Sequence, residues 1–229
     1  MNTLVSAYWG EGISDERFLP VLIQRTLEAL MMQCAQGEWD VLEPLALHPD
    51  RNAKGFVDQV LDLSRQASGF HLLFIHTDAD APDETQSAIP FKIKPAIEAI
   101  QNTPAGHDYC KEIIPVIPVV QIENWKLSDS AALREALATE LNDTVLGLNI
   151  GTQQLEEKSE SKELLAAILD KINDGRRILV LPEDLDAALA KGIHLQQIYR
   201  FRSFERFVNR LKASLIAQNI LEEDCQPRF

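Results

Sequence analysis

The order of apolar and polar residues predicts strands alternating with helices over the first half of the chain. Residues 3–9 (TLVSAYW) form a short, apolar, β-rich run that ends at a Gly-Glu-Gly turn. From Ser14 to Gln36, apolar residues recur at three- and four-residue spacing, which predicts a helix with Ser14 as its N-cap. A second strand is predicted over 39–47, and a second helix over 56–68.

The clearest strand is the continuous apolar run from Phe70 to Ile75, which is typical of a central parallel strand covered on both faces. A helix is predicted over 91–101. The run 113–120 is β-branched but contains two prolines, which lack ladder donors, and this favours an edge or irregular strand. Together these elements predict an α/β fold with a mainly parallel sheet. Trp9 and Phe74 are expected in its core.

The second half of the chain changes character. Helical periodicity covers 131–141, 162–172 and 204–217, and Pro182 is a typical first helical residue. Residues 177–181 (RILVL) fit either a strand or a buried helix, and the polar segment 152–163 is the best candidate for a flexible loop or linker. We therefore expect a catalytic core over 1–128 and a mostly helical extension over 129–229, packed on that core.

Composition fits a folded protein of one large domain. Apolar residues make up 45% of the chain, and no stretch approaches the roughly 20 apolar residues that span a bilayer. The N-terminus lacks the basic and apolar regions of a signal peptide. Cys34, Cys110 and Cys225 are widely spaced and odd in number, so we expect neither a disulfide framework nor a zinc site. These features predict a cytoplasmic protein without a membrane anchor.

The net charge of −13 argues against a protein that grips nucleic acid by itself, because such proteins usually present a basic face. A divalent cation or a basic partner would overcome the repulsion between this acidic chain and the phosphates of a nucleic acid. An acidic surface is also ordinary for globular proteins. One basic stretch stands out, and it fits either a nucleic-acid contact or a solvated helix face: Arg200, Arg202, Arg206, Arg210 and Lys212.

Acidic residues follow three of the predicted strands. Glu11 follows the first, Asp78 and Asp80 follow the third, and Glu123 follows the fourth, while Asp15 lies one helical turn beyond Glu11. Ligands of parallel α/β sheets bind at the carboxyl ends of the strands, where these acids would meet. Clustered carboxylates repel one another unless a cation lies among them, and Mg²⁺ prefers a few carboxylates with water and phosphate oxygens.

These acids resemble the signature of the Toprim domain, with Glu11 in GEGISDE and Asp78/Asp80 in HTDAD. The resemblance is closer to a prokaryotic Toprim-related family that is often encoded beside ABC-type ATPases, associated with phage defence and related to the overcoming-lysogenisation-defect nucleases. Its members have an acid-tryptophan patch like QIENW, which contains Glu123, and a final helix like SFERF at 203–207.

The resemblance implies a four-stranded, mainly parallel sheet flanked by helices, and a nuclease that uses Mg²⁺ or Mn²⁺. Asp78, Asp80, Glu11, Asp15 and Glu123 would bind metal, and Glu11, Asp78 and Asp80 would act in catalysis. An ABC-type ATPase partner and a nucleic-acid substrate follow from the same resemblance. The lysine that such nucleases use is not identified by sequence, and three candidates are Lys126, Lys158 and Lys162.

Structural interpretations compete with these roles. Asp129 fits the N-cap of a helix, His76 fits a local hydrogen bond at a strand end, and Trp125 fits a core side chain. Arg51 and Lys54 fit a solvated loop better than a phosphate contact. The rival functions are a metal- or nucleotide-binding regulatory subunit and a nucleotidyl- or phosphotransferase acting on a small substrate. A topoisomerase is disfavoured, because the sequence indicates no second domain that offers a tyrosine nucleophile.

Overall fold

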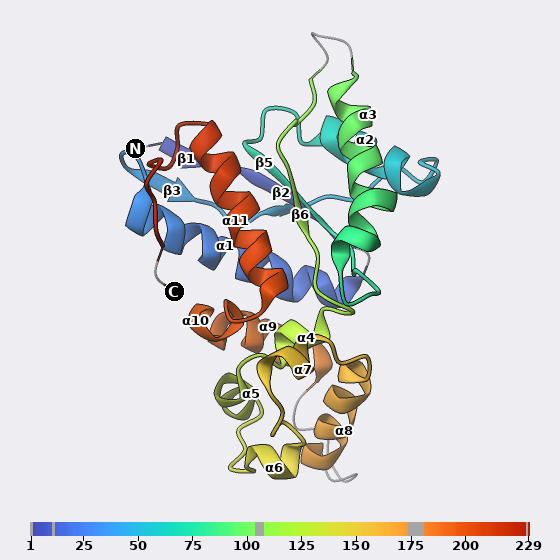
Figure 1. Cartoon of the computed structure of the whole chain (residues 1–229), viewed down its shortest axis with the longest axis vertical. Helices are drawn as coiled ribbons and strands as arrows, with labels where there is room; N and C mark the ends of the chain where they lie inside the picture. The colour runs from blue at the N-terminus through green and yellow to red at the C-terminus, as the bar shows by residue number, and fades with distance from the viewer. Residues whose placement is uncertain (1, 11, 104–107, 174–180, 228) are drawn as a thin grey trace.

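The centre of the molecule is a four-stranded parallel sheet with the order β4-β2-β5-β6 (Figure 1). Its strands are β2 (Ser6–Trp9), β4 (Leu45–Ala46), β5 (Leu72–His76) and β6 (Ile113–Val116). This computed structural model describes residues 2–10, 12–103, 108–173, 181–227 and 229. The expected α/β class is confirmed, with β5 inside the sheet and the proline-containing β6 at its edge.

Two of the expected strands are each divided into a pair of shorter strands. The first run gives β1 (Asn2–Leu4) and β2, and the second gives β3 (Trp39–Val41) and β4. β1 and β3 form a separate two-stranded parallel sheet. The division falls at Val5, which exchanges hydrogen bonds with His71 through the imidazole ring and the backbone. The chain therefore changes its pairing partners at Val5, from β3 before it to β4 and β5 after it. The pattern of hydrophobic residues does not predict this change.

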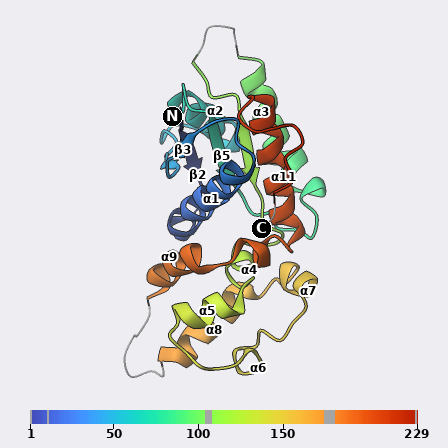
Figure 2. The same cartoon turned by 90° about the vertical axis from the view of Figure 1, so that its left-hand side faces the viewer.

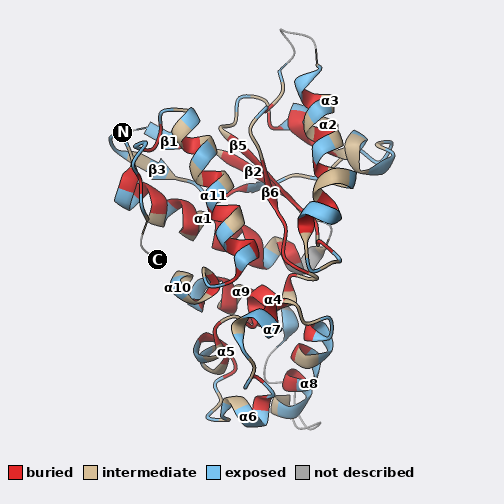
Figure 3. Ribbon diagram, in the orientation of Figure 1, coloured by how far each residue is buried: buried red, intermediate tan, exposed pale blue. Residues whose placement is uncertain are grey.

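Helices cover both faces of the four-stranded sheet (Figure 2). On one face lie α1 (Ile13–Cys34) and α11 (Arg202–Ala217), and they share a core with Tyr8 and Phe74. On the other lie α2 (Gly55–Gln66) and α3 (Lys94–Gln101), which share a second core with Trp9. The central strands are buried throughout (Figure 3). Trp9 and Phe74 are core residues, as expected.

Helix α1 begins two residues earlier than its sequence suggests. Its N-cap is Gly12, so the prediction of Ser14 as the N-cap is wrong. The backbone N–H of Gly12 donates to Oδ2 of Asp15 at 3.0 Å. A carboxylate at the third helical position can satisfy the free N–H of the N-cap, which is why Asp15 fixes the start of the helix.

The second half of the chain is helical in its described part. α4 (Glu123–Lys126), α5 (Ser130–Ala136), α6 (Asp143–Leu146), α7 (Thr152–Glu156) and α8 (Ser161–Asn173) gather beyond one end of the sheet (Figure 1). After α9 (Pro182–Gly192) and α10 (Leu195–Ile198) the chain returns to the sheet as α11. The division at residue 128 stays a prediction, although the extension does pack on the core, where the Phe207 ring of α11 lies edge-on to Phe74.

The expectation of a flexible linker over 152–163 is wrong. This segment contains α7 and the start of α8, and its Glu156 side chain is buried. Glu156 accepts hydrogen bonds from the backbone N–H groups of Arg202 and Ser203 and from the Ser203 hydroxyl. A carboxylate is favourable at the positive end of the helix dipole, so Glu156 anchors α11. In the ambiguous run 177–181, only Leu181, the N-cap of α9, lies within the described residues.

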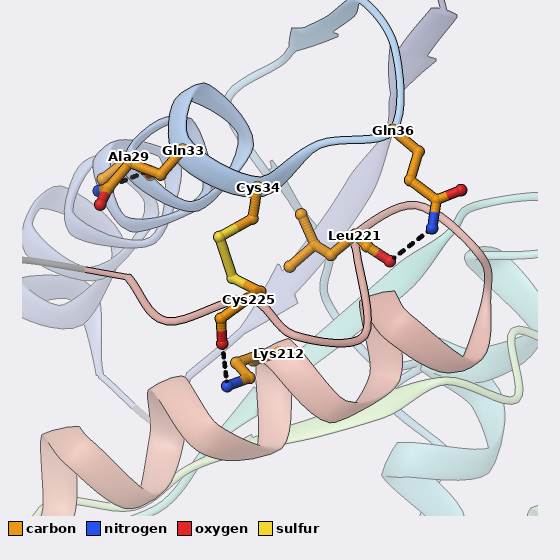
Figure 4. Close-up of a disulfide and its surroundings, with 7 residues drawn as sticks. All are labelled: Ala29, Gln33, Cys34, Gln36, Lys212, Leu221 and Cys225. Atoms are coloured by element: carbon orange, nitrogen blue, oxygen red, sulfur yellow. Dashed lines mark hydrogen bonds between the residues drawn. A yellow bond between two sulfur atoms is a disulfide. The ribbon is translucent and has the colours of Figure 1, made fainter.

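The expectation that the cysteines form no disulfide is also wrong. Cys34, at the end of α1, is bonded to Cys225 in the C-terminal tail, and their Cα atoms are 5.4 Å apart (Figure 4). The tail pairs with the same turn, because Gln36 Nε2 donates to the carbonyl of Leu221 at 3.0 Å. Sequence distance concealed this contact, since 191 positions separate the two cysteines. Cys110 is free, and burial raises its pKa to about 11.

The helices in the described part of the chain are all too short or too polar to cross a membrane.

Candidate metal centre at the carboxyl edge of the sheet

His76 is the point where two of the predicted site acids meet. The ring ends β5, and its Nδ1 lies 3.0 Å from the carbonyl oxygen of Val116 on β6. Its Nε2 lies 3.5 Å from Oδ2 of Asp15 and 3.8 Å from Oδ1 of Asp78. The structure therefore brings together two acids that are far apart in sequence.

The environment of His76 sets the orientation of its ring. A carbonyl oxygen only accepts hydrogen bonds, so Nδ1 carries the hydrogen that faces Val116. The remaining nitrogen, Nε2, faces the carboxylates of Asp15 and Asp78. The expected local hydrogen bond of His76 is confirmed, but the ring also contacts the acidic site, which the sequence alone did not settle.

Asp15 has the structural role at the helix start that its position suggested, and it also lies beside His76. Its side chain is buried, with 6% of the residue exposed, and the same Oδ2 accepts the Gly12 N–H and faces His76. A carboxylate at a helix N-terminus is stabilised by the helix dipole. These contacts place Asp15 at the edge of the sheet where β5 ends.

Asp78 and Asp80 lie in different environments, although only one residue separates them. Beyond β5 the chain continues to pair with β6, because Thr77 N donates to Val116 O and Ala79 N donates to Pro118 O. This pairing holds the half-buried Asp78 beside His76. Asp80 is exposed, has a φ of 52°, and makes no hydrogen bond or ion pair with any described residue. Asp80 therefore stays a prediction as a metal ligand.

Glu11 falls outside the described residues, so its predicted roles as ligand and catalytic group remain predictions.

The segment that leads from β6 to Glu123 is strained. Val120 has a φ of 61°, and Gln121 N donates to Val119 O at 2.8 Å across it. A three-residue turn with positive φ is rare, especially at a β-branched residue, and such strain is concentrated at functional sites. The turn starts α4, whose first residue is the half-buried Glu123.

Lys126 and Asp186 form a buried ion pair beside the acidic site, which the sequence did not predict. The ammonium of Lys126 lies 2.8 Å from Oδ1 of Asp186, and both side chains are buried. Burial raises the pKa of Asp186, as do the negative charges of Glu123 and Asp15, while Lys126 opposes the rise. Asp186 therefore belongs electrostatically to the acidic site, although it comes from α9. In sequence it looked only like part of a helix start, and no signal marked it.

The donor chemistry suits a hard divalent cation, because carboxylate oxygens such as those of Asp15 and Asp78 are preferred Mg²⁺ ligands. Yet no three His, Cys, Asp or Glu side chains within residues 2–10, 12–103, 108–173, 181–227 and 229 are grouped so that they would hold an ion. If an ion binds at this edge, the described side chains would supply only part of its coordination shell. A complete shell would also need Glu11, water or substrate oxygens.

Comparisons with protein-family models, curated proteins and solved structures found no match to this chain. The Toprim resemblance therefore rests on the acids and motifs of the chain itself.

The three arginines of α11 pair with acids of this chain. Arg202 pairs with Glu157, and both Arg206 and Arg210 pair with the buried Glu84. Lys212 donates to the carbonyl of Cys225 (Figure 4). These contacts favour the interpretation of α11 as a structural helix over that of a nucleic-acid contact.

The remaining basic candidates divide between paired and exposed residues. Lys158 pairs with Glu160 at 3.4 Å. Arg51 and Lys54 are exposed in the loop that follows β4 and precedes α2. Because β4 is parallel to β2, this loop leaves the same edge of the sheet, and its His48 lies 3.7 Å from Glu16 in the first turn of α1.

Proposed function

We propose that this chain is a divalent-metal-dependent nuclease that hydrolyses phosphodiester bonds of DNA or RNA at the carboxyl edge of its sheet. The observation that carries the proposal is the approach of both Asp15 and Asp78 to His76 Nε2, at 3.5 and 3.8 Å. The two acids come from separate elements, and they meet where parallel sheets bind their ligands.

In this proposal Asp15 and Asp78 hold Mg²⁺ or Mn²⁺ together with Glu11, Asp80 and Glu123. The bound ion would polarise the phosphate and activate water. His76 fixes the positions of both described acids through its contact with β6, and the Gly12 N–H orients Asp15. Without a bound ion, the acids would repel one another and the phosphates of the substrate.

The negative charge of the chain is consistent with a basic partner protein. Its net charge is −13, and the arginines of α11 are occupied by internal acids. A basic surface for nucleic acid would then come from a second protein, for which the ABC-type ATPase of the resembling family is the candidate, within a phage-defence system. A cytoplasmic location belongs to the same proposal. Because disulfides are rare in that compartment, the oxidation state of Cys34 and Cys225 in freshly lysed cells tests it.

Two other functions fit the same acids. A regulatory subunit would bind metal or nucleotide without cleaving a polymer. A nucleotidyl- or phosphotransferase would turn over a small substrate instead. The positions of the buried Asp15 and the half-buried Asp78 beside His76 support metal binding in all three cases, so the substrate decides among them.

The test is cleavage of supercoiled plasmid, linear duplex and single-stranded RNA in Mg²⁺ or Mn²⁺. We expect Asp15→Asn, Asp78→Asn and Glu11→Gln to abolish cleavage. The matched control is Asp40→Asn, which makes the same charge change at an exposed residue of β3. Undiminished cleavage by the Asp78 and Glu11 variants would refute the assignment. Metal binding without cleavage, even with the ATPase present, would favour the regulatory subunit.

A further inference from the structure

Tyr8 lies in the middle of the sheet, on the face that carries two of the site residues. It is fully buried on β2 and pairs in register with Phe74 on β5. Tyr8 and Phe74 belong to the same core, which α1 covers. Because successive side chains of a strand point to opposite faces, His76 lies on the same face as Phe74. The first turn of α1 adds Asp15 to this side of the sheet.

Gly10 allows the Tyr8 hydroxyl to approach the start of α1. A Cβ atom at this position would lie 1.9 Å from the Tyr8 hydroxyl oxygen and 3.2 Å from Cβ of Asp15. Atoms do not approach one another as closely as the first of these distances, so any larger residue would push the Tyr8 ring aside. Glycine is the residue that permits such a close approach. The hydroxyl and Asp15 are therefore neighbours at the turn between β2 and α1.

The Tyr8 hydroxyl makes no hydrogen bond to any residue in the described part of the chain. A buried hydroxyl without a partner costs roughly 1–3 kcal/mol, so its retention calls for an explanation. Burial raises the pKa of Tyr8, as do the negative charges of Asp15 and Glu16, and the hydroxyl keeps its hydrogen. The acidic edge thus has a buried donor beside one of its carboxylates.

We propose that Tyr8 is a positioning residue of the metal centre, whose hydroxyl donates a hydrogen bond to the Asp15 carboxylate when that carboxylate binds a divalent cation. This inference rests on the proposed function, because it assigns a partner to one metal ligand of that same site. Carboxylates that bind metal are themselves held by hydrogen bonds, and loss of such a partner weakens metal binding about 10–100-fold.

The proposal separates the effect of the hydroxyl on metal binding from its effect on the fold. Tyr8→Phe removes the hydroxyl and keeps the ring in the core. In metal-free protein it should leave the melting temperature unchanged or raise it, because it removes an unsatisfied buried polar group. In the presence of metal the same variant should lose affinity. A tyrosine with a purely structural role would give the reverse result, a lower melting temperature with an unchanged affinity.

The test is titration calorimetry of the full chain with Mn²⁺ or Mg²⁺, together with thermal unfolding in EDTA. For Tyr8→Phe we expect the Kd for Mn²⁺ to rise about 10–100-fold. The matched control is Tyr199→Phe, directly after α10, where the ring packs on Phe229 and the Kd should not change. Asp15→Ala should itself weaken binding, and adding Tyr8→Phe to it should weaken binding little further, because the hydroxyl acts through Asp15.

The outcomes separate this inference from the nuclease proposal. If the unaltered protein binds Mn²⁺ and cleaves nucleic acid but Tyr8→Phe keeps its Kd, then the inference fails while the function stands. A lower metal-free melting temperature in Tyr8→Phe, or a full further loss of affinity on top of Asp15→Ala, also overturns the inference. If the unaltered protein binds neither ion, both proposals fail. A raised Kd with an undiminished metal-free melting temperature supports the role of Tyr8.

Discussion

The ammonium nitrogen of Lys126 lies 2.8 Å from Oδ1 of Asp186, and the two side chains are only 2% and 7% exposed. Lys126 ends α4 and Asp186 lies in α9, so the pair joins the segment after β6 to a helix that packs on α1. The Phe18 ring of α1 lies 5.6 Å from the same ammonium. The pair therefore connects the helical region to the acidic edge.

Removing one partner of this pair should destabilise the fold strongly. Lys126→Met leaves Asp186 buried without its counter-ion, and we expect it to lower the free energy of unfolding by about 3–5 kcal/mol. The double variant Lys126→Met/Asp186→Leu removes both charges and should recover most of that loss, because well-packed apolar groups often replace a buried ion pair without cost. Urea unfolding followed by circular dichroism measures all the variants, including Asp186→Leu. A double variant as unstable as the worse single variant would contradict the expectation.

The disulfide between Cys34 and Cys225 should stabilise the protein by restricting the unfolded chain. It closes a loop across 191 sequence positions, and loss of a native disulfide costs roughly 2–5 kcal/mol. Cys225→Ser should therefore lower the melting temperature in non-reducing buffer. Addition of dithiothreitol should lower that of the unaltered protein to a similar value. Cys110→Ser, at the free cysteine, is the control for loss of a thiol. Equal melting temperatures with and without reductant would disprove the bond's role.

Several elements were predictable because a single physical cause determined them. β5 is an unbroken apolar run, so burial on both faces fixed its central place in the sheet. α11 follows its apolar spacing closely, and its Phe207 contacts the sheet as amphipathicity predicts. Asp129 caps α5 as expected, by accepting from Ala131 N and Ala132 N. In these cases local pattern and tertiary packing favour the same structure.

Most of the errors share a different cause, because they depended on a contact between residues distant in sequence, whereas the Ser14 N-cap was overridden by the local contact between Gly12 and Asp15. Glu156 lies in a polar segment that reads as a linker, yet α11 supplies its hydrogen bonds. Asp186 gains its role from Lys126, and Cys34 gains its partner from the C-terminal tail. For the site, the order of strands and acids in the sequence predicted that Asp78 and Asp15 would lie close together, and both lie beside His76. The same order gave no indication that Asp186 lies near them.

Asp129 should make stability depend on pH in acid. Burial alone raises the pKa of its carboxyl, but hydrogen bonds from the backbone and ring of His194 and from Ala132 N hold it below the ordinary value of 3.8. A depressed pKa stabilises the fold above 3.8, and this stabilisation is lost as pH falls through the folded-state pKa. Asp129→Asn keeps an N-cap acceptor, so near neutral pH it should cost less than Asp129→Ala, for which we expect about 0.5–2 kcal/mol.

Urea unfolding of the Asp129 variants at several pH values between neutral and strongly acid measures this effect. The difference between the unaltered protein and Asp129→Asn should narrow as pH falls below 3.8 and vanish below the folded-state pKa, where the carboxyl is protonated in both the folded and the unfolded chain. A difference that stays constant, or one that widens in acid, would rule out the carboxylate as its source.

The arginines of α11 should support stability and contribute little to nucleic-acid binding. Glu84 is fully buried and pairs with Arg210 and, at 3.7 Å, with Arg206, so it ties the loop after Asp80 to α11. Arg210→Met leaves that carboxylate with a weaker partner. Because Arg210 is partly exposed, we expect the free energy of unfolding to fall by about 2–3 kcal/mol, less than for a fully buried pair.

The slope of log Kd against log salt for DNA binding should not change in Arg210→Met, since this charge is already neutralised within the chain. Glu205→Gln, at an exposed residue of the same helix, is the control for stability. A normal melting temperature combined with a reduced salt slope in Arg210→Met would reverse this interpretation and make α11 the nucleic-acid contact.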